Sequence, residues 1–292
     1  MEAVIQKARV LIEALPYIQN FRGAIIVVKF GGSAMEEESG MHSVLADIAF
    51  MECVGMHPVI VHGGGKAISR GMEEEGITSC FVKGLRVTCE KTIRVVEKVL
   101  KGDVNPKVVA MLTGMGGRAK PLHGEEVFRV TKKTATDERT GEVIDWGLVG
   151  EPGEVKTEPV LALVEEGVIP VITPLGLGLD SRVHNINADT AAAAVARALK
   201  ARKLAYLSDV PGLLRHADEP DTLISTLKVS EVRELVDLGV ISGGMLPKVE
   251  SGVEALRAGV GKVHMIDGRM QHSLLLEIFT DRGVGTQIVM DE

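Results

Sequence analysis

Three glycine-bearing segments, each with a basic residue at one end, are the part of this sequence best suited to chemistry. They are Lys29-Phe30-Gly31-Gly32-Ser33, His62-Gly63-Gly64-Gly65 and Ser242-Gly243-Gly244-Met245-Leu246-Pro247-Lys248. Glycine lets the backbone approach an anion closely, and the open N–H groups of such turns bind phosphate. Two lysines on opposite sides of an in-line displacement can stabilise the attacking and leaving oxygens. The pattern predicts a phosphoryl-transfer site.

Lys29 lies at the end of the first buried strand that the sequence predicts. Residues 24–28 are apolar without interruption, which is typical of a strand covered on both faces in a parallel sheet. The ammonium group of Lys29 would emerge at the carboxyl end of the sheet, where open α/β folds bind ligands. A lysine at a strand end is more often only a solvated residue, so the prediction of a site depends on Gly31 and Gly32.

The second glycine segment follows the next predicted strand and precedes a helix. Three successive glycines exceed what a tight turn requires, and a helix N-terminus attracts carboxylate or phosphate groups. The segment is not a dinucleotide fingerprint, because Ile68 stands in place of the third glycine. It is not a Walker A loop either, because Lys66 is followed by Ala67.

Two further segments carry polar candidates. Arg86, within residues 84–88, can hold a carboxylate through two parallel hydrogen bonds, although an arginine in a charged segment is more often a surface residue. Asn185 and Asn187 alternate with an apolar residue ahead of an alanine-rich helix, so they face the same side of the chain. Asp189 follows them. It either caps that helix or lies between the two lysines, where it would keep their like charges close at tolerable cost.

No nucleophile–base arrangement accompanies these segments, since the sequence contains neither His-Glu-x-x-His nor Gly-x-Ser-x-Gly. An acceptor that is itself a carboxylate, with a reference pKa of about 4.3, is already ionised at neutral pH and requires no base. The product would then be an acyl phosphate. Asp209, which ends a later predicted strand, is either a turn residue or the border of a nucleotide pocket.

Composition limits the class of protein. The chain has 292 residues, 45% of them hydrophobic and 25% charged, which suffices for one large α/β domain or two lobes. A net charge of -7 argues against a nucleic-acid-binding surface. Cys53, Cys80 and Cys89 form no Cys-x-x-Cys pair, so neither a disulfide framework nor a zinc site is expected. The sequence shows no signal peptide and no membrane-spanning run, which predicts a soluble cytoplasmic protein.

Apolar runs and helical periodicity predict an α/β fold whose two lobes share one sheet. Strands are expected at 24–30, 58–61, 168–172, 203–207 and 263–266, and helices around 41–55, 90–100, 188–200, 229–238 and 246–258. Residues 115–157 lose the helical period and predict a hairpin-rich insertion over an edge of the sheet. An amphipathic helix at 3–19 precedes the core, and Pro16 should kink or end it. This helix packs either on its own subunit or on a neighbouring one.

From about residue 24 to the end, these segments in this order resemble the amino acid kinase family. Segments 84–88 and 185–189 are similar to those of members that phosphorylate N-acetyl-L-glutamate. The resemblance implies ATP-dependent phosphorylation of the γ-carboxylate of N-acetyl-L-glutamate, with Mg2+ accompanying the nucleotide, as the second step of arginine biosynthesis. It implies a three-layer α/β/α sandwich with a central, mainly parallel open sheet. Residues 1–22 would form an oligomerisation helix, 23–180 a lobe for acetylglutamate binding and dimerisation, and 181–292 a lobe for ATP and arginine.

The resemblance also assigns roles to residues of this chain. Lys29 and Lys248 would stabilise the transition state, and Asp189 would organise the two lysines. The residues implied for acetylglutamate are Gly64, Gly65, Arg86, Asn185 and Asn187, with Arg86 on the α-carboxylate. The residues implied for ATP are Gly31, Gly32, Asp209, Gly243 and Gly244. No side chain is assigned to a metal ion.

Both ends of the chain resemble the arginine-inhibited, hexameric members. Segment 14–18 is similar to the N-terminal helix that joins three dimers into a ring, and 272–280 with 283–286 is similar to the arginine-site signature. The residues implied for L-arginine are Tyr17, His272, Glu277 and Gly283. The resemblance therefore implies a homo-oligomer, a dimer or a trimer of dimers, with feedback inhibition by arginine. Plant and cyanobacterial relatives bind a PII nitrogen-signalling protein, which makes such a protein a candidate partner.

Other hypotheses fit less of the sequence. A glutamate 5-kinase, an aspartokinase or a carbamate kinase would share the lysines and glycines but lack the segment at 84–88. A chiefly regulatory, arginine-responsive docking subunit would not need the intact set of Lys29, Asp189 and Lys248. A dinucleotide-dependent dehydrogenase suits the fold class but not the missing fingerprint. The unusually charged segment 132–140 has no assigned role.

Overall fold

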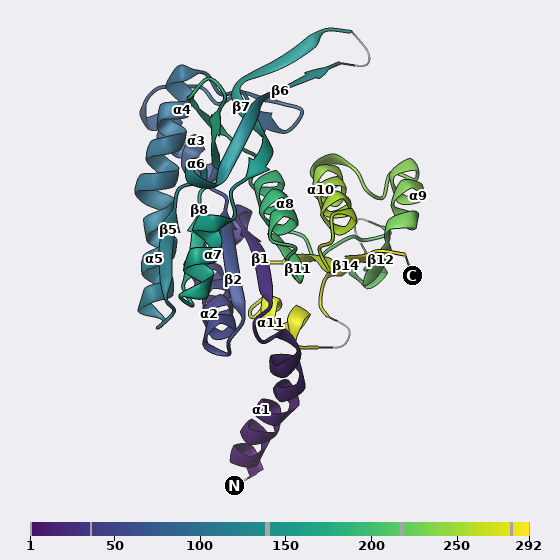
Figure 1. The fold of residues 1–292 in the computed structure, drawn as a ribbon. Coiled ribbons are helices and arrows are strands. Elements are labelled where there is room, and N and C mark those ends of the chain that lie inside the picture. Colours follow the sequence, from purple (N-terminus) through teal and green to yellow (C-terminus); the bar gives the residue numbers. More distant parts are fainter. Residues whose placement is uncertain (1, 36, 138–140, 217–218, 281–282, 292) are drawn as a thin grey trace.

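The predicted strands all belong to one open sheet in the computed structural model, which describes residues 2–35, 37–137, 141–216, 219–280 and 283–291 (Figure 1). The strands of this sheet are β1 (Ile25–Phe30), β2 (His57–His62), β5 (Ala119–Leu122), β8 (Ile169–Ile172), β11 (Lys203–Ser208), β12 (Thr226–Lys228), β13 (Lys262–Asp267) and β14 (Thr286–Val289). In the order β12-β14-β13-β11-β1-β2-β8-β5, every neighbouring pair is parallel except β13 and β14. The mainly parallel open sheet is confirmed.

The helices include all those that the sequence predicts and further ones that it did not predict, such as those over residues 105–114 and 158–165. They are α1 (Glu2–Phe21), α2 (Glu38–Cys53), α3 (Gly65–Glu74), α4 (Glu90–Glu97), α5 (Asn105–Gly114), α6 (Gly124–Val127), α7 (Glu158–Glu165), α8 (Ala188–Ala198), α9 (Val232–Asp237), α10 (Leu246–Arg257) and α11 (Ser273–Ile278). Shorter helical elements are the 3-10 segments η1 (Gly32–Met35), η3 (Pro220–Thr222), η4 (Val229–Glu231) and η5 (Gly243–Met245), and the π-helix η2 (Lys98–Val104) between α4 and α5. None of the helices within the described ranges has the length and apolarity needed to cross a membrane.

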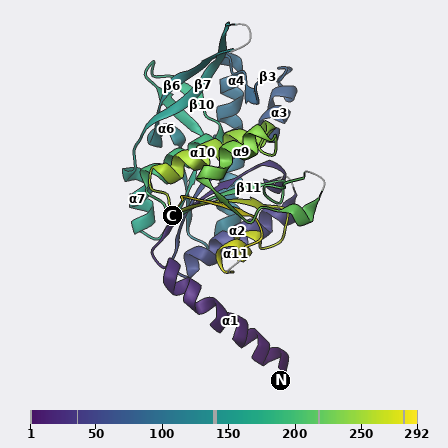
Figure 2. The ribbon, with the colours of Figure 1, turned by 90° about the vertical axis from the view of Figure 1, so that its right-hand side faces the viewer.

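Two groups of helices cover the sheet, one on each face (Figures 1 and 2). Side chains of a strand point alternately to opposite faces, so β1 supplies both layers. Val27 is buried in a cluster with α7, α8 and α10, whereas Ile26 and Val28 are buried in a second cluster with α2, α5 and α11. The three-layer α/β/α sandwich is confirmed.

The two predicted lobes share this sheet. Strand β1 pairs with β2 on one side and with β11, from the second half of the chain, on the other. The sheet therefore continues across the middle of the molecule without a break. The proposed boundaries after residues 22 and 180 stay a prediction.

The hairpin-rich insertion exists, but the prediction that it lies over an edge of the sheet was wrong. Strands β6 (Phe128–Thr136) and β7 (Val143–Val155) form a small closed sheet with β9 (Leu175–Gly178) and β10 (Val183–Asn185). Because β9 closely follows the carboxyl end of β8 and pairs with β6, the insertion is anchored beyond the carboxyl ends of the strands (Figure 1). Of the charged segment 132–140, residues 138–140 lie outside the described residues.

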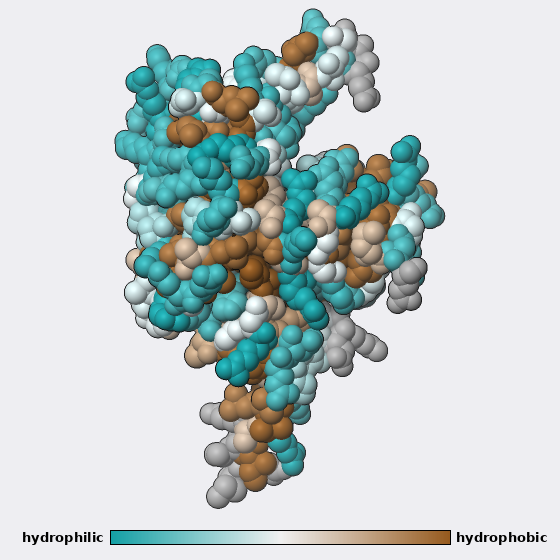
Figure 3. Space-filling view, viewed as in Figure 1, coloured by the Kyte–Doolittle hydropathy of each residue, from teal (hydrophilic) through white to brown (hydrophobic). Residues whose placement is uncertain are grey.

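Helix α1 extends away from the body of the molecule (Figures 1 and 2). Pro16 removes one backbone hydrogen bond but does not end the helix, which continues to Phe21. Apolar side chains along α1 are exposed, among them Leu11 and Ile12, each 68% exposed (Figure 3). This apolar surface is therefore not covered by the helix's own subunit.

Candidate active site

A pocket of about 510 Å³ lies at the carboxyl ends of β1 and β2. The loop after β1, the loop after β2 and the segment that leads into α8 all contribute to its lining. The volume is within the usual range for sites that bind small molecules. The structure therefore brings the predicted glycine segments after β1 and β2 together with residues 185–189.

Lys29 and Lys248 meet on opposite oxygens of one carboxylate, that of Asp189. Lys29 shares the face of Val27, which packs against α8, so its side chain reaches the first turn of that helix. Its Nζ lies 3.0 Å from Asp189 Oδ1, and Lys248 Nζ, from the first turn of α10, donates a hydrogen bond to Asp189 Oδ2. Burial opposes the ionisation of Asp189 more than any other single influence, but the two ammonium groups outweigh it and lower the pKa of this carboxyl.

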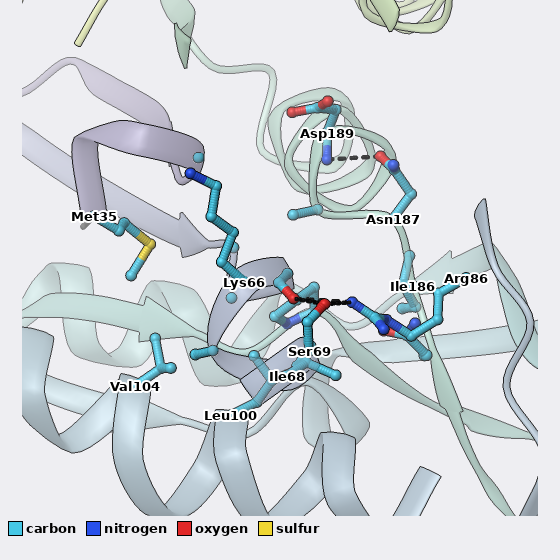
Figure 4. Close-up of a pocket in the computed structure, with 18 of the residues that line it drawn as sticks. Met35, Lys66, Ile68, Ser69, Arg86, Leu100, Val104, Ile186, Asn187 and Asp189 are labelled. Atoms are coloured by element: carbon cyan, nitrogen blue, oxygen red, sulfur yellow. Dashed lines mark hydrogen bonds between the residues drawn. The ribbon is translucent and has the colours of Figure 1, made fainter. Parts of the chain in front are cut away.

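Asp189 is not the cap of α8. Asn187 holds that position, and its side-chain Oδ1 accepts hydrogen bonds from the backbone N–H groups of Asp189, at 2.9 Å (Figure 4), and Thr190, at 3.1 Å. Because Asn187 satisfies these N–H groups, the Asp189 carboxylate is left for the two lysines. Asn185 and Asn187 both line the pocket, as their alternation predicts.

The two glycine loops after β1 and β2 touch each other through their backbones. The Gly63 N–H donates to Phe30 O at 2.6 Å, and a Cβ at Gly63 would lie only 3.2 Å from the Cα of Gly31. Gly64 is the N-cap of α3, and a Cβ there would lie 2.5 Å from the side chain of Leu100. These close contacts therefore favour glycine at both positions of the second loop.

Arg86 is buried in the pocket wall, contrary to the surface location that is usual for an arginine. Its Nη2 donates to Gly65 O at 2.9 Å and to Ser69 Oγ at 2.8 Å (Figure 4), and its Nη1 donates to Ser79 Oγ at 2.6 Å. The guanidinium also stacks over the Phe81 ring at 4.6 Å. Burial lowers the pKa of Arg86, and no carboxylate pairs with it within the described part of the chain. A buried cation without a counter-charge favours an anionic ligand.

Sequence reasoning missed several cationic residues that line the pocket. Lys66 and Arg70 lie one turn apart near the start of α3, and Lys107 comes from α5. Lys66 extends across the pocket toward the segment that carries Met35 (Figure 4). The available signal was that residues 66 and 70, four apart, share one face of a helix that begins at a predicted anion site.

Only some of the residues predicted to bind ATP lie at the pocket. Gly32 lines the pocket, and Gly31 packs under Lys29, whose Nζ would be 3.1 Å from a Cβ at that position. Asp209, Gly243 and Gly244 are exposed and lie outside the pocket lining. Their role in nucleotide binding stays a prediction.

The four residues predicted for arginine gather around α11. Glu277 is buried, and its carboxylate accepts hydrogen bonds from the backbone N–H groups of Val284, at 2.7 Å, and Gly285, at 2.9 Å. A Cβ at Gly283 would lie 2.4 Å from Glu277 Oε2. His272 Nδ1 lies 2.6 Å from Asp47 Oδ1 on α2.

Aromatic contacts connect this region to α1. The Tyr17 ring lies 6.2 Å from that of Phe279, just after α11. A cation–π contact connects the end of α1 to the sheet: the Nζ of Lys203, at the start of β11, lies 4.9 Å from the centre of the Phe21 ring. Burial, with smaller contributions from neighbouring cations, lowers the pKa of Lys203 to about 8.

Comparison with known proteins identifies the class. Residues 24–267 match the profile of the amino acid kinase family. The chain therefore belongs to this family, and it is an enzyme, a kinase, for which ATP is a substrate. It is 49% identical over 292 residues to the acetylglutamate kinase of Carboxydothermus hydrogenoformans (strain ATCC BAA-161 / DSM 6008 / Z-2901), and the match covers 99% of each chain.

Solved structures agree with this assignment. Two structures of the N-acetylglutamate synthase from Neisseria gonorrhoeae, complexed with coenzyme A and either N-acetyl-glutamate or L-arginine, match with TM-scores of 0.83 and 0.78 at 28% and 27% identity. The matches cover 97% and 95% of this chain but only 63% and 64% of the synthase. Carbamate kinase from Giardia lamblia bound to AMP-PNP has the same fold, with a TM-score of 0.67 at 17% identity over 92% of this chain and 99% of that one.

The buried ring of His62, at the end of β2, makes the stability of the fold sensitive to acid. Burial lowers the pKa of His62 to about 4, from the 6.5 that is usual for histidine. Below pH 6.5 the unfolded chain therefore binds a proton that the folded chain excludes, so the free energy of unfolding falls as the pH drops toward 4, by up to roughly 3 kcal/mol. Urea unfolding at pH 7, 5.5 and 4.5 measures the decline, and His62→Asn should make it shallower. Parallel declines in the two proteins would contradict this origin.

Proposed function

We propose that this protein is an acetylglutamate kinase, which transfers the γ-phosphoryl group of ATP to the γ-carboxylate of N-acetyl-L-glutamate and forms N-acetyl-L-glutamyl 5-phosphate in arginine biosynthesis. The observation that carries the proposal is that two separate cationic groups belong to one pocket. Arg86 is a buried cation without a carboxylate partner in the described chain, and Lys29, which lines the same pocket, lies with Lys248 on Asp189. Arg86 suits the α-carboxylate of an amino-acid substrate, and the two lysines suit a phosphoryl group.

Catalysis would rest on charge and orientation. The acceptor carboxylate is ionised at neutral pH and attacks without a base. Lys29 and Lys248 would stabilise the charge on the attacking and leaving oxygens, and Asp189 would hold the two ammonium groups in place. Arg86 would turn from Ser69 and Ser79 to the substrate α-carboxylate.

The remaining predicted site residues would surround this centre. Gly64, Gly65, Asn185 and Asn187 line the pocket where the acceptor would lie. The loops of Gly31, Gly32, Asp209, Gly243 and Gly244 would hold ATP. The described residues contain no group of three or more acidic, histidine or cysteine side chains that could hold a metal ion. The carboxylate of Asp189 is paired with Lys29 and Lys248. A Mg2+ ion would therefore be held mainly by the phosphates of ATP.

Replacing Asp189 with asparagine tests the lysine pair. The neutral amide cannot hold two ammonium groups as a carboxylate does, so Lys29 and Lys248 should repel each other and lose alignment. We expect kcat to fall about 100-fold or more. Asp237→Asn is the matched control, because it makes the same change at an exposed carboxylate that pairs with Arg233 on α9. Undiminished turnover of Asp189→Asn would remove the proposed role.

The choice of acceptor is tested by trapping the acyl phosphate as a hydroxamate. N-acetylglutamate, glutamate, aspartate and bicarbonate with ammonia are supplied in parallel, each with ATP and Mg2+. We expect product from N-acetylglutamate alone, because acetylation removes the α-ammonium charge that glutamate and aspartate would bring beside the Arg86 guanidinium, and bicarbonate has no α-carboxylate for Arg86 to bind. Turnover of another acceptor would refute the substrate assignment and leave the kinase assignment intact.

Regulation by L-arginine and assembly through α1 are part of the same proposal. Tyr17, Glu277 and Gly283 lie where α1 meets the region around α11, so arginine bound there would contact the helix that carries the exposed apolar surface. Supporting this, a structural relative at 27% identity was crystallised with L-arginine. A trimer of dimers joined through α1 would cover Leu11 and Ile12.

The assembly is tested by placing charge on α1. The double variant Leu11→Glu/Ile12→Glu should dissociate the hexamer into dimers and weaken inhibition by millimolar arginine, since two carboxylates cannot be buried unpaired. Light scattering after size exclusion, with and without arginine, measures the mass. Gln19→Glu places charge on the same helix at an exposed polar position and should change neither result. A wild type that is monomeric, or indifferent to arginine, would refute this part of the proposal.

A further inference from the structure

We propose that His62 is a positioning residue: fixed in one neutral tautomer by Asn105, it turns the Gly63 carbonyl inward and thereby aims the Gly64 N–H at the phosphoryl group being transferred. The identity of that group rests on the proposed function. His62 and Asn105 are both fully buried next to the second glycine loop.

Three hydrogen bonds determine the tautomer of His62. Its Nδ1 lies 2.7 Å from Gly63 O, and a carbonyl oxygen can only accept, so Nδ1 carries the proton. Asn105 Nδ2 donates to Val171 O at 2.8 Å, which fixes the orientation of the amide. The same Nδ2 lies 3.0 Å from His62 Nε2 and can only donate, so Nε2 is unprotonated. A ring that carries a proton on Nδ1 and none on Nε2 is neutral. Burial lowers the pKa of His62 to about 4, so the ring stays neutral at pH 7.

The orientation of one carbonyl fixes the orientation of the next N–H. The described chain contains no cis peptide bond, so the Gly63 carbonyl and the Gly64 N–H point in opposite directions. The carbonyl points to the buried imidazole, and the N–H therefore points away from it, toward the pocket that Gly64 lines. Within the described residues nothing accepts a hydrogen bond from this N–H. It is a donor left for a ligand.

The elements behind His62 hold this peptide in place. Asn105 begins α5 directly after the π-helix η2, and the side chain of Leu100 in η2 packs against Gly64. Asn105 also ties η2 and α5 to β8 through Val171. π-Helical turns are rare and occur frequently at functional sites. A purely structural role would require burial of the ring but not a donor aimed at Gly63.

Two substitutions separate the nitrogens of the ring. Asparagine places an amide near the position of Nδ1 and can still donate to Gly63 O, whereas glutamine places its amide near Nε2 and keeps only the contact with Asn105. We expect His62→Gln to lower the single-turnover rate about tenfold to hundredfold, with the KM for both substrates within about threefold of wild type. His62→Asn should stay within about threefold in both quantities. Equal rates in the two variants, both normal or both low, would overturn the proposal.

A measurement on the wild-type protein does not depend on the folding of either variant. In protein labelled with 15N-histidine, long-range proton–nitrogen correlation at pH 7 should show His62 protonated at Nδ1 and bare at Nε2, and the pattern should persist to about pH 5. An Nε2–H tautomer would overturn the proposal. The wild-type hydroxamate assay run beside it reports separately on the proposed function, because the tautomer is read without any substrate.

Discussion

The structure of the site depends on one carboxylate held between two ammonium groups. Lys29, Asp189 and Lys248 come from β1, α8 and α10, which are far apart in sequence and adjacent in the fold. Without the carboxylate, two like charges would be held close together in a largely buried place, which is costly. With it, the group keeps one net positive charge at the carboxyl end of the sheet. The two glycine loops touch each other beside Lys29.

Local patterns were enough to predict the frame of the site. Residues 24–28 and the periodicity of residues 188–200 predicted β1 and α8, so Lys29 and Asp189 could be assigned to the same end of the sheet. Which of two roles Asp189 plays could not be decided, because the answer depends on whether Asn187 caps the helix. Two residues suited to capping stood within three positions, and only the folded backbone shows which of them satisfies the N–H groups.

Contacts that are distant in sequence could not be predicted. The burial of Arg86 depends on Ser69, Ser79 and Phe81, and none of these contacts has a sequence signature. The hairpin of β6 and β7 was expected at a sheet edge, because nothing in residues 115–157 shows that β6 pairs with β9, whose partner residues lie 48 positions later in the chain. The close approach of Leu100 to Gly64 likewise depends on a π-helix that periodicity does not predict.

The proposed chemistry explains why the site contains charges and donors but no base. Transfer of a phosphoryl group to a carboxylate moves no proton, so the protein has to bring two anions together and hold them in line. A chain of net charge -7 does this with a local concentration of cations that includes Lys29, Lys66 and Arg86. The buried histidine behind the glycine loop fits the same logic. His62 donates from Nδ1 to a backbone carbonyl and accepts at Nε2 from an amide, so it cannot also take a proton from a substrate. The role of His62 is therefore to fix the orientation of the Gly63–Gly64 peptide bond. Such a role suits a reaction that depends on alignment and charge.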